Sequence, residues 1–189
     1  ADIGAISDQA ISGLTAANIA ALDHEQIGGL KSTQIAKLTY FQIKAFASDQ
    51  LSVFTTAQIG ALNGLQVSAL GSEAVPLLST GQIAAIDPMS VPGLTTAQIE
   101  AFTPIQAEAL TSAQVARLTF AQVDAFDVED LAAFSAADIA SLTRSGINGL
   151  SESDIMSLRR EQLDAFTAEQ YQVMDSQTIW AIAAAYEAA

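Results

Sequence analysis

The feature that most constrains this chain is an eight-residue repeat that keeps its phase along almost the whole sequence. From Ser7 to Ile182 the sequence divides into 22 consecutive octads without an insertion or deletion. The consensus is [T/S/D]-x-x-Q-[I/V]-x-A-[L/F], as in TAANIAAL, TTAQIGAL and TSAQVARL. A period held for this long is the signature of a tandem array. We therefore predict a single octapeptide-repeat array over residues 1–189, with regular octads over 7–182 and a helical C-terminal end over 175–189.

Each octad carries a signal for the start of a helix. The first position is Ser, Thr, Asp or Asn in 18 units, and the fourth position is Gln in 13. In Thr95-x-x-Gln98 this spacing forms a capping box, in which the threonine hydroxyl and the glutamine side chain each accept a hydrogen bond from the other residue's backbone N–H. Pro88 and Pro104 fall on the second position, where proline is favoured as the first helical residue. One short helix therefore begins in every octad.

Two other architectures fit the repeat less well. In one continuous helix an eight-residue period exceeds two turns, so the apolar stripe would drift around the axis and a cap residue would recur inside the helix. A β-solenoid needs alternating apolar residues, which the I-x-A-L spacing does not supply. We predict an all-α fold, an α-solenoid of very short helices with one helix per octad, whose units stabilise one another by stacking.

The apolar positions define the expected core. Positions five and eight are apolar in all 22 octads and share one helical face, so they should point inward. Position seven is Ala, Gly or Ser in 17 octads, which allows neighbouring backbones to approach closely. Positions two, three and six should face outward. The pattern leaves open how many octads complete one turn of the coil.

Two octads depart from the consensus. Residues 71–78 and 87–94 lack the glutamine and carry Pro76 and Pro92 at position six. Proline there removes a helical hydrogen bond and clashes with the preceding turn, so we expect these two helices to be truncated. The departures are either drift that the array tolerates or a built-in bend or docking point.

Composition excludes several functions. The 21 acidic residues outnumber 7 basic ones, and a net charge of −14 repels nucleic acid and anionic lipid. The apolar run over 179–185 is too short to cross a bilayer. The absence of cysteine removes disulfides and thiol catalysis, and fits either a reducing cytosol or a bacterial secreted protein. We expect neither nucleic-acid binding nor membrane insertion.

We also expect no enzyme activity and no catalytic, cofactor-binding or metal-binding residue. Serines and threonines act as caps, no phosphate-binding glycine loop is present, and the carboxylates occupy outward positions without converging. His24, the only histidine, lies between Asp23 and Glu25 and lacks the further ligands that a metal site needs. The acidic cluster of Asp124, Asp127, Glu129 and Asp130 lacks the spacing of a calcium loop and is expected to be a solvated face.

Association with other chains is the expected partnership. Several apolar side chains fall at outward positions, where together they could form lateral contacts; they are Tyr40, Phe41, Leu65, Met89, Ile105, Phe120 and Val128. Ile3 and Ile6 have no preceding octad, so we expect this end to meet another chain or further repeats, whereas the segment from Asp175 could cap its own end.

The units TTAQIGAL, TTAQIEAF and TSAQVARL resemble the LTTAQIAAL-type tandem repeats of large bacterial proteins that are often described as secreted, calcium-binding or adhesin-like. The resemblance covers nearly the whole chain and implies a bacterial extracellular or cell-surface location, with type I secretion as the export route. The calcium-binding β-roll segments of such proteins are missing here, and no functional residue is carried over. We therefore expect a structural protein, either a stalk or spacer of a surface adhesin or a filament subunit. The alternative is a binding module whose solenoid surface takes a peptide or polysaccharide.

Overall fold

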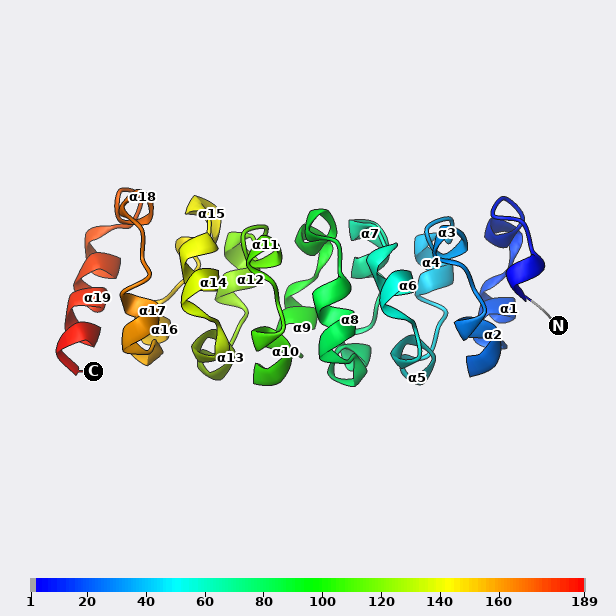
Figure 1. Ribbon diagram of the computed structural model, residues 1–189, viewed down its shortest axis with the longest axis horizontal. Helices are drawn as coiled ribbons and strands as arrows, with labels where there is room; N and C mark the ends of the chain where they lie inside the picture. The colour runs from blue at the N-terminus through cyan, green and yellow to red at the C-terminus, as the bar shows by residue number, and fades with distance from the viewer. Residues whose placement is uncertain (1–2, 189) are drawn as a thin grey trace. The chain divides into compact units, whose positions relative to one another are not determined.

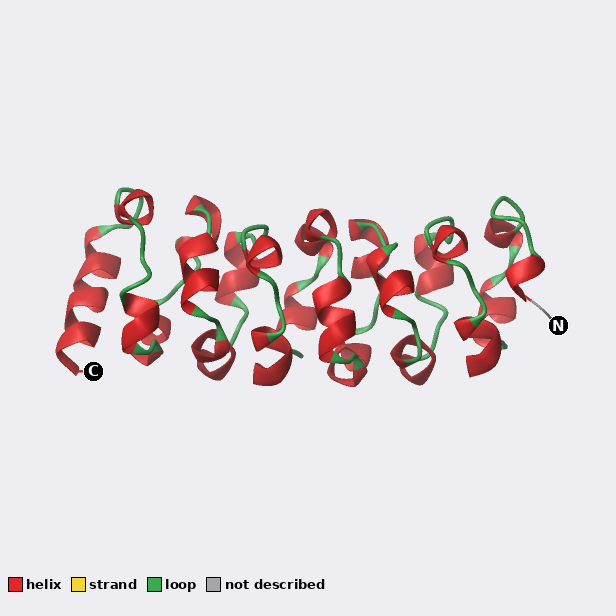
Figure 2. Ribbon diagram, in the orientation of Figure 1, coloured by secondary structure: helices red, strands yellow, loops and turns green. Residues whose placement is uncertain are grey.

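The computed structural model describes residues 3–188, and within this range the chain is helical without a strand (Figure 2). Every octad from Ser7 to Ile182 contains one helical element (Figure 1), which confirms the predicted α-solenoid of short helices. The chain divides into two compact units, Ala1–Ala101 and Phe102–Ala189, which we describe separately. The octad phase continues through this boundary, and the single array remains a prediction.

Short helical elements follow one another along the first unit. They are η1 Ile3–Ala5, η2 Ile11–Gly13, α1 Ala16–Ala20, α2 His24–Gly28, α3 Ser32–Ile35, α4 Tyr40–Ile43, α5 Ser48–Ser52, α6 Thr56–Gly60, α7 Gly64–Ser68, η3 Ser72–Leu77, α8 Thr80–Ala85, η4 Pro88–Gly93 and α9 Thr96–Ile99, where η marks a 3₁₀ helix.

The second unit continues the pattern and ends in one longer helix. Its elements are α10 Pro104–Glu108, α11 Ser112–Val115, α12 Phe120–Asp124, α13 Val128–Ala133, α14 Ala136–Ser141, α15 Arg144–Ile147, α16 Glu152–Ser157, α17 Arg160–Leu163, α18 Ala168–Tyr171 and α19 Ser176–Ala188.

The predicted capping boxes start these helices. At α9 the backbone N–H of Gln98 donates to the Thr95 hydroxyl at 3.2 Å, and the N–H of Thr95 donates to the Gln98 side-chain oxygen at 2.8 Å. Thr95 itself is extended, with φ −78° and ψ 158°, so each cap also forms the corner between two helices. Among the described residues no φ is positive, and the corners therefore need no left-handed glycine.

Packing between helices three octads apart builds the coil. In the first unit α4 contacts α7, and α7 contacts η4; in the second unit α10 contacts α13, and α13 contacts α16. Positions five and eight form the core as predicted, with Ile59 and Leu62 almost fully buried. Position four is buried in most octads from Gln34 onward, because it lies next to position five on the inward side of each short helix, whereas Asn18 is exposed and Gln26 is half-buried.

Small residues allow the turns of the coil to touch, as position seven predicted. A Cβ atom on Gly93 would overlap the backbone of Gly64 in the adjacent helix. One on Gly149 would lie 2.5 Å from the carbonyl oxygen of Phe120. At these positions only glycine leaves room for the neighbouring backbone.

The expected truncation of the two proline-containing helices is wrong. Both η3 and η4 are six residues long, as long as the longest of α1 to α18. They are 3₁₀ helices, because Pro76 and Pro92 offer no N–H and their rings clash with the carbonyl four residues earlier in an α-helix. Bonds such as Leu78 N–H to Val75 carbonyl, at 3.0 Å, close the tighter turn instead.

The last octad breaks the expected inward pattern. As predicted, the chain forms a longer helix there, α19, of 13 residues. Because no new cap interrupts α19, its buried face consists of Ala181, Ile182 and Ala185, and Ile179 at position five is exposed. Tyr186 joins α19 to α17 through a 2.6 Å hydrogen bond from its hydroxyl to Asp164, which raises the pKa of the tyrosine to about 12.

Candidate functional site

The fourth octad position forms the most regular polar arrangement in the molecule. The Gln58 side chain is buried, and its Oε1 accepts the backbone N–H of Thr55 at 2.7 Å, closing the capping box of α6. Its Nε2 donates to the carbonyl oxygens of Ile27 and Leu30, both at 2.8 Å. One amide therefore satisfies the start of its own helix and the end of α2, which lies one turn of the coil earlier.

This arrangement, which we call the glutamine ladder, repeats within each unit. In every case Nε2 donates to the carbonyl oxygen 28 residues earlier, at 2.5 to 2.9 Å. The pairs are Gln34–Ile6, Gln42–Leu14, Gln50–Leu22, Gln58–Leu30, Gln66–Leu38, Gln82–Phe54 and Gln98–Leu70 in the first unit, and Gln162–Phe134 and Gln170–Leu142 in the second. This spacing, together with packing three octads apart, places one turn of the coil between three and four octads.

The ladder solves a problem that short helices create. The last four carbonyl groups of any α-helix lack a partner within the helix, so a helix of four to six residues leaves most of its carbonyls unsatisfied. Burying such groups without a hydrogen bond costs about 1–3 kcal/mol each. The glutamine amide donates to the carbonyl at the last position of an octad one turn earlier, and so supplies the donor that this carbonyl lacks. Because the amide is hydrogen-bonded, the glutamine side chain can be buried next to the apolar core.

Sequence reasoning identified only half of the glutamine's role. The capping box was predicted, but the second set of bonds was not, because it joins residues 28 positions apart. A signal was present: capping alone can be met by Glu or Gln, and no octad carries Glu at position four. That preference indicates that the side chain must also donate.

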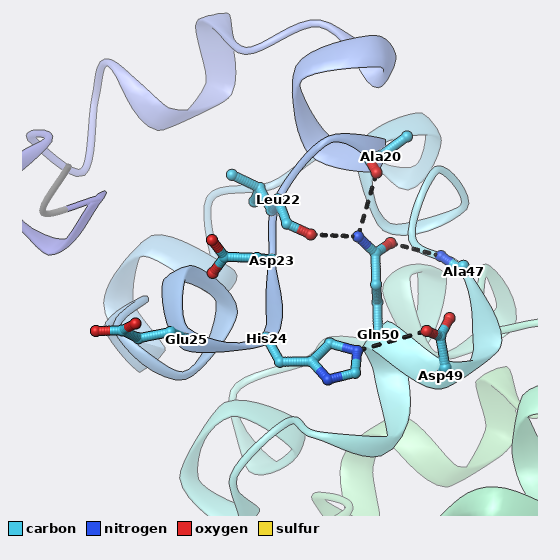
Figure 3. A pocket seen from close by; sticks show the side chains of 8 residues that line it. All are labelled: Ala20, Leu22, Asp23, His24, Glu25, Ala47, Asp49 and Gln50. Carbon is cyan, nitrogen blue, oxygen red and sulfur yellow. Dashed lines mark hydrogen bonds and ion pairs between the residues drawn. The ribbon is translucent and has the colours of Figure 1, made fainter.

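One rung lies beside the only histidine (Figure 3). Gln50 donates to the carbonyls of Leu22 and Ala20 and accepts the N–H of Ala47. Next to it His24 Nε2 lies 3.4 Å from an Asp49 carboxylate oxygen. Asp23 and Glu25 line the same hollow of about 620 Å³. His24 is exposed, as predicted, and it pairs with a residue one turn of the coil away.

The ladder has substitutes at some octads. Ser90 donates through its hydroxyl to the Leu62 carbonyl at 2.8 Å, again 28 residues earlier. Asp138 instead accepts, from the Ser112 hydroxyl at 2.6 Å and from the backbone N–H of Ser135 at 2.9 Å. Asp130 does neither: both of its carboxylate oxygens are buried without a hydrogen-bond partner.

The expectation that all carboxylates face outward is therefore wrong at position four. Asp130, Asp138 and Asp154 are buried, because that position faces inward. The acidic cluster of Asp124, Asp127, Glu129 and Asp130 is a solvated face in its first three members only. Burial, followed by the charges of Asp127 and Glu129, raises the pKa of Asp130 to about 7.

Three outward apolar residues form a line on the first unit, which we call the apolar stripe. Phe41, Leu65 and Met89 occupy position three of their octads, on α4, α7 and η4, at intervals of 24 residues. These helices pack in that order, and the side chains are 75%, 65% and 69% exposed. Of the other predicted outward residues, Ile105 and Phe120 are exposed, whereas Tyr40 and Val128 are partly covered.

Within residues 3–188, histidine and carboxylate side chains form no cluster of three or more that could hold a metal ion. In the same part of the chain, no helix combines the length and apolarity needed to span a membrane. Comparison with known protein families and with curated proteins gives no match to this chain.

Proposed function

We propose that this chain is a structural repeat protein of the bacterial cell surface or extracellular matrix, acting as a stalk, a spacer or a filament subunit and carrying no catalytic activity. The glutamine ladder is the observation that carries this proposal. The most regular buried polar side chain of the octad, exemplified by Gln58, makes its hydrogen bonds within the array, to its own cap and to the preceding turn.

Such a ladder suits a protein whose role is to hold its length. Within each unit, neighbouring turns are joined by an apolar core and by buried hydrogen bonds, so pulling two turns apart breaks both kinds of contact at once. Consensus octads can be added to such an array one after another, because each one supplies both the glutamine donor and the carbonyl acceptors that its neighbouring turns require.

The location follows from the resemblance of the octads to repeats of bacterial secreted proteins. A net charge of −14 also suits a hydrated exterior surface that avoids nucleic acid and anionic lipid. Export by type I secretion is part of the same proposal.

The partner in this proposal is a second copy of the chain, and the contact is the apolar stripe. Phe41, Leu65 and Met89 repeat with the 24-residue spacing of packed helices, so a second copy alongside would present side chains with the same spacing. Homotypic contacts of this kind use one self-complementary patch on both partners.

The alternative is a binding module that presents its surface to a peptide or polysaccharide. The stripe favours this reading too, since it concentrates exposed apolar side chains on one line of the first unit. The two proposals differ in what covers the stripe.

Sedimentation velocity over a wide range of protein concentrations, combined with negative-stain microscopy, tests the proposal. We expect concentration-dependent association of the wild-type chain, and fibres or lateral bundles in the microscope. The variant Phe41→Gln/Leu65→Gln/Met89→Gln should sediment as a monomer throughout.

Ile105→Gln is the matched control, because Ile105 also lies at position three and is 69% exposed but is not part of the stripe. It should associate like the wild type. A wild-type chain that stays monomeric at every concentration would contradict the proposed self-association. Binding of a peptide or polysaccharide that the triple variant loses would establish the alternative.

A further inference from the structure

Asp130 stands at the octad position that carries the ladder glutamine elsewhere, but its side chain makes none of the ladder's hydrogen bonds. It lies at position four of the octad 127–134, on α13, and is only 1% exposed. Both carboxylate oxygens are without a hydrogen-bond partner, and they are the only buried side-chain polar atoms of residues 3–188 in that state. A buried polar group of this kind requires an explanation.

The other aspartates at position four are accommodated differently. Asp138 accepts bonds from Ser112 and Ser135, and Asp154 accepts the backbone N–H of Ser151 at 2.7 Å. Both side chains therefore have donors within reach while ionised. The Asp130 carboxylate has no donor in hydrogen-bond geometry, although the Asp127 carboxylate accepts the backbone N–H of Asp130 at 2.8 Å.

The register of the ladder identifies what the Asp130 side chain would meet. The residue 28 positions earlier is Phe102, which immediately precedes the cap of α10, and α10 packs against α13. At this place every ladder glutamine finds a carbonyl oxygen, which is an acceptor. An ionised carboxylate is also only an acceptor, whereas a neutral carboxyl group has one O–H to donate.

The charges around Asp130 favour its neutral form. On its own helix, Asp127 and Glu129 are both acidic and raise its pKa in addition to burial, while the Asp127 backbone N–H opposes the shift without reaching hydrogen-bond geometry. The packed helix α10 carries Glu108, and α16 carries Glu152 and Asp154, so all titratable groups on the two helices are carboxyl groups. Arg159 reaches the opposite end of α13, where it donates to the Phe134 carbonyl at 3.1 Å.

We propose that Asp130 is a proton-operated rung of the glutamine ladder. When neutral, it donates its O–H to the carbonyl of Phe102 and joins α13 to α10; when ionised, it opens this rung and loosens the contact between the two helices. With a pKa of about 7, the change would occur near neutral pH, and acidification would tighten the second unit. This property is independent of the proposed structural role.

Two measurements on the full chain test the proposal. A carbon-detected NMR titration should show the Asp130 carboxyl group titrating near pH 7. Hydrogen exchange of the α10 and α13 backbone amides, corrected for intrinsic rates, should show protection at least about tenfold greater at pH 5.5 than at pH 8.5. In Asp130→Asn, which has no charge to gain, protection should be equal at the two pH values.

Two control variants separate the rung from general effects of pH. Asp138→Asn removes a buried aspartate that already has partners, and it should keep the wild-type difference between the two pH values. Asp130→Gln restores the ladder residue and should give high protection at both. The proposal is overturned if Asp130 titrates near pH 4, or if α10 and α13 in the wild type and in Asp130→Asn respond to pH alike.

Discussion

The side-chain nitrogen of Gln58 lies 2.8 Å from the carbonyl oxygen of Leu30, 28 residues earlier in the chain. The same amide accepts the backbone N–H of Thr55 at 2.7 Å through its oxygen. A single residue thus begins one short helix and completes another, and this double use explains why glutamine recurs where glutamate would cap equally well.

Replacing Gln58 with methionine keeps much of the side chain's volume but removes all of these bonds. The carbonyl group of Leu30 and the N–H of Thr55 lose the bonds that Gln58 makes to them, and the carbonyl of Ile27 keeps only its backbone bond from the Leu30 N–H. We expect a loss of unfolding free energy on the order of 2–4 kcal/mol, measured by urea denaturation. Gln26→Met is the control: among the described residues its side chain makes only the capping bond to Asp23, so its loss should be about 1 kcal/mol.

Glycine at position 93 is predicted to be irreplaceable. A Cβ atom there would overlap the backbone of Gly64, and neither backbone can move without disturbing the packing of α7 against η4. Gly93→Ala should therefore destabilise the first unit by about 1–3 kcal/mol or more. Gly13→Ala, which meets no atom within 4 Å, should be neutral or slightly stabilising. Equal effects at the two sites would show that the turns are not in contact at Gly93.

The core positions should be far more sensitive than the outward ones. Leu118, at position eight, is 2% exposed, whereas Ala116, at position six, is partly exposed. Leu118→Ala should cost on the order of 2–5 kcal/mol, and Ala116→Ser should stay within about 0.5 kcal/mol. Equal losses in thermal and urea denaturation would place the core elsewhere.

Much of the fold could be predicted because the helix-start signal is local. Thr95 and Gln98 lie three residues apart, so their capping box can be read from adjacent letters of the sequence, and positions five and eight follow from it. The bond from Gln98 to Leu70 could not be read in this way. It depends on how far the coil rises in one turn, which is set by the accumulated angles of several corners.

The same reason explains the errors at individual residues. Asp130 was expected to be solvated because acidic residues surround it in the sequence, yet position four faces the preceding turn of the coil. Ile179 was expected to be buried because it fits the octad, yet the uninterrupted helix α19 turns it toward solvent. Pro76 was expected to shorten its helix, yet a 3₁₀ turn accommodates it.

The raised pKa of Asp130 predicts a pH dependence of stability. Well below pH 3.8 the carboxyl group is protonated in both the folded and the unfolded chain. As the pH rises from about 4 to 7, the unfolded chain, with its ordinary pKa of 3.8, releases the proton while the folded chain retains it, so stability falls. Between pH 4 and 8 the wild type should lose on the order of 1–4 kcal/mol relative to Asp130→Asn, measured by urea titration. An equal pH profile for the two proteins would rule out this effect.

Hydrogen exchange of the glutamine side chains measures the ladder directly. The Nε2 protons of Gln58, Gln66 and Gln98 are buried and hydrogen-bonded to the preceding turn, whereas Gln9 and Gln177 are exposed. Resolved by NMR on the folded chain, the ladder amides should exchange slower than the exposed pair by on the order of 100-fold or more. If all of these amides exchanged at the same rate, the glutamines would be caps alone, and the ladder could not be what joins the turns of the solenoid.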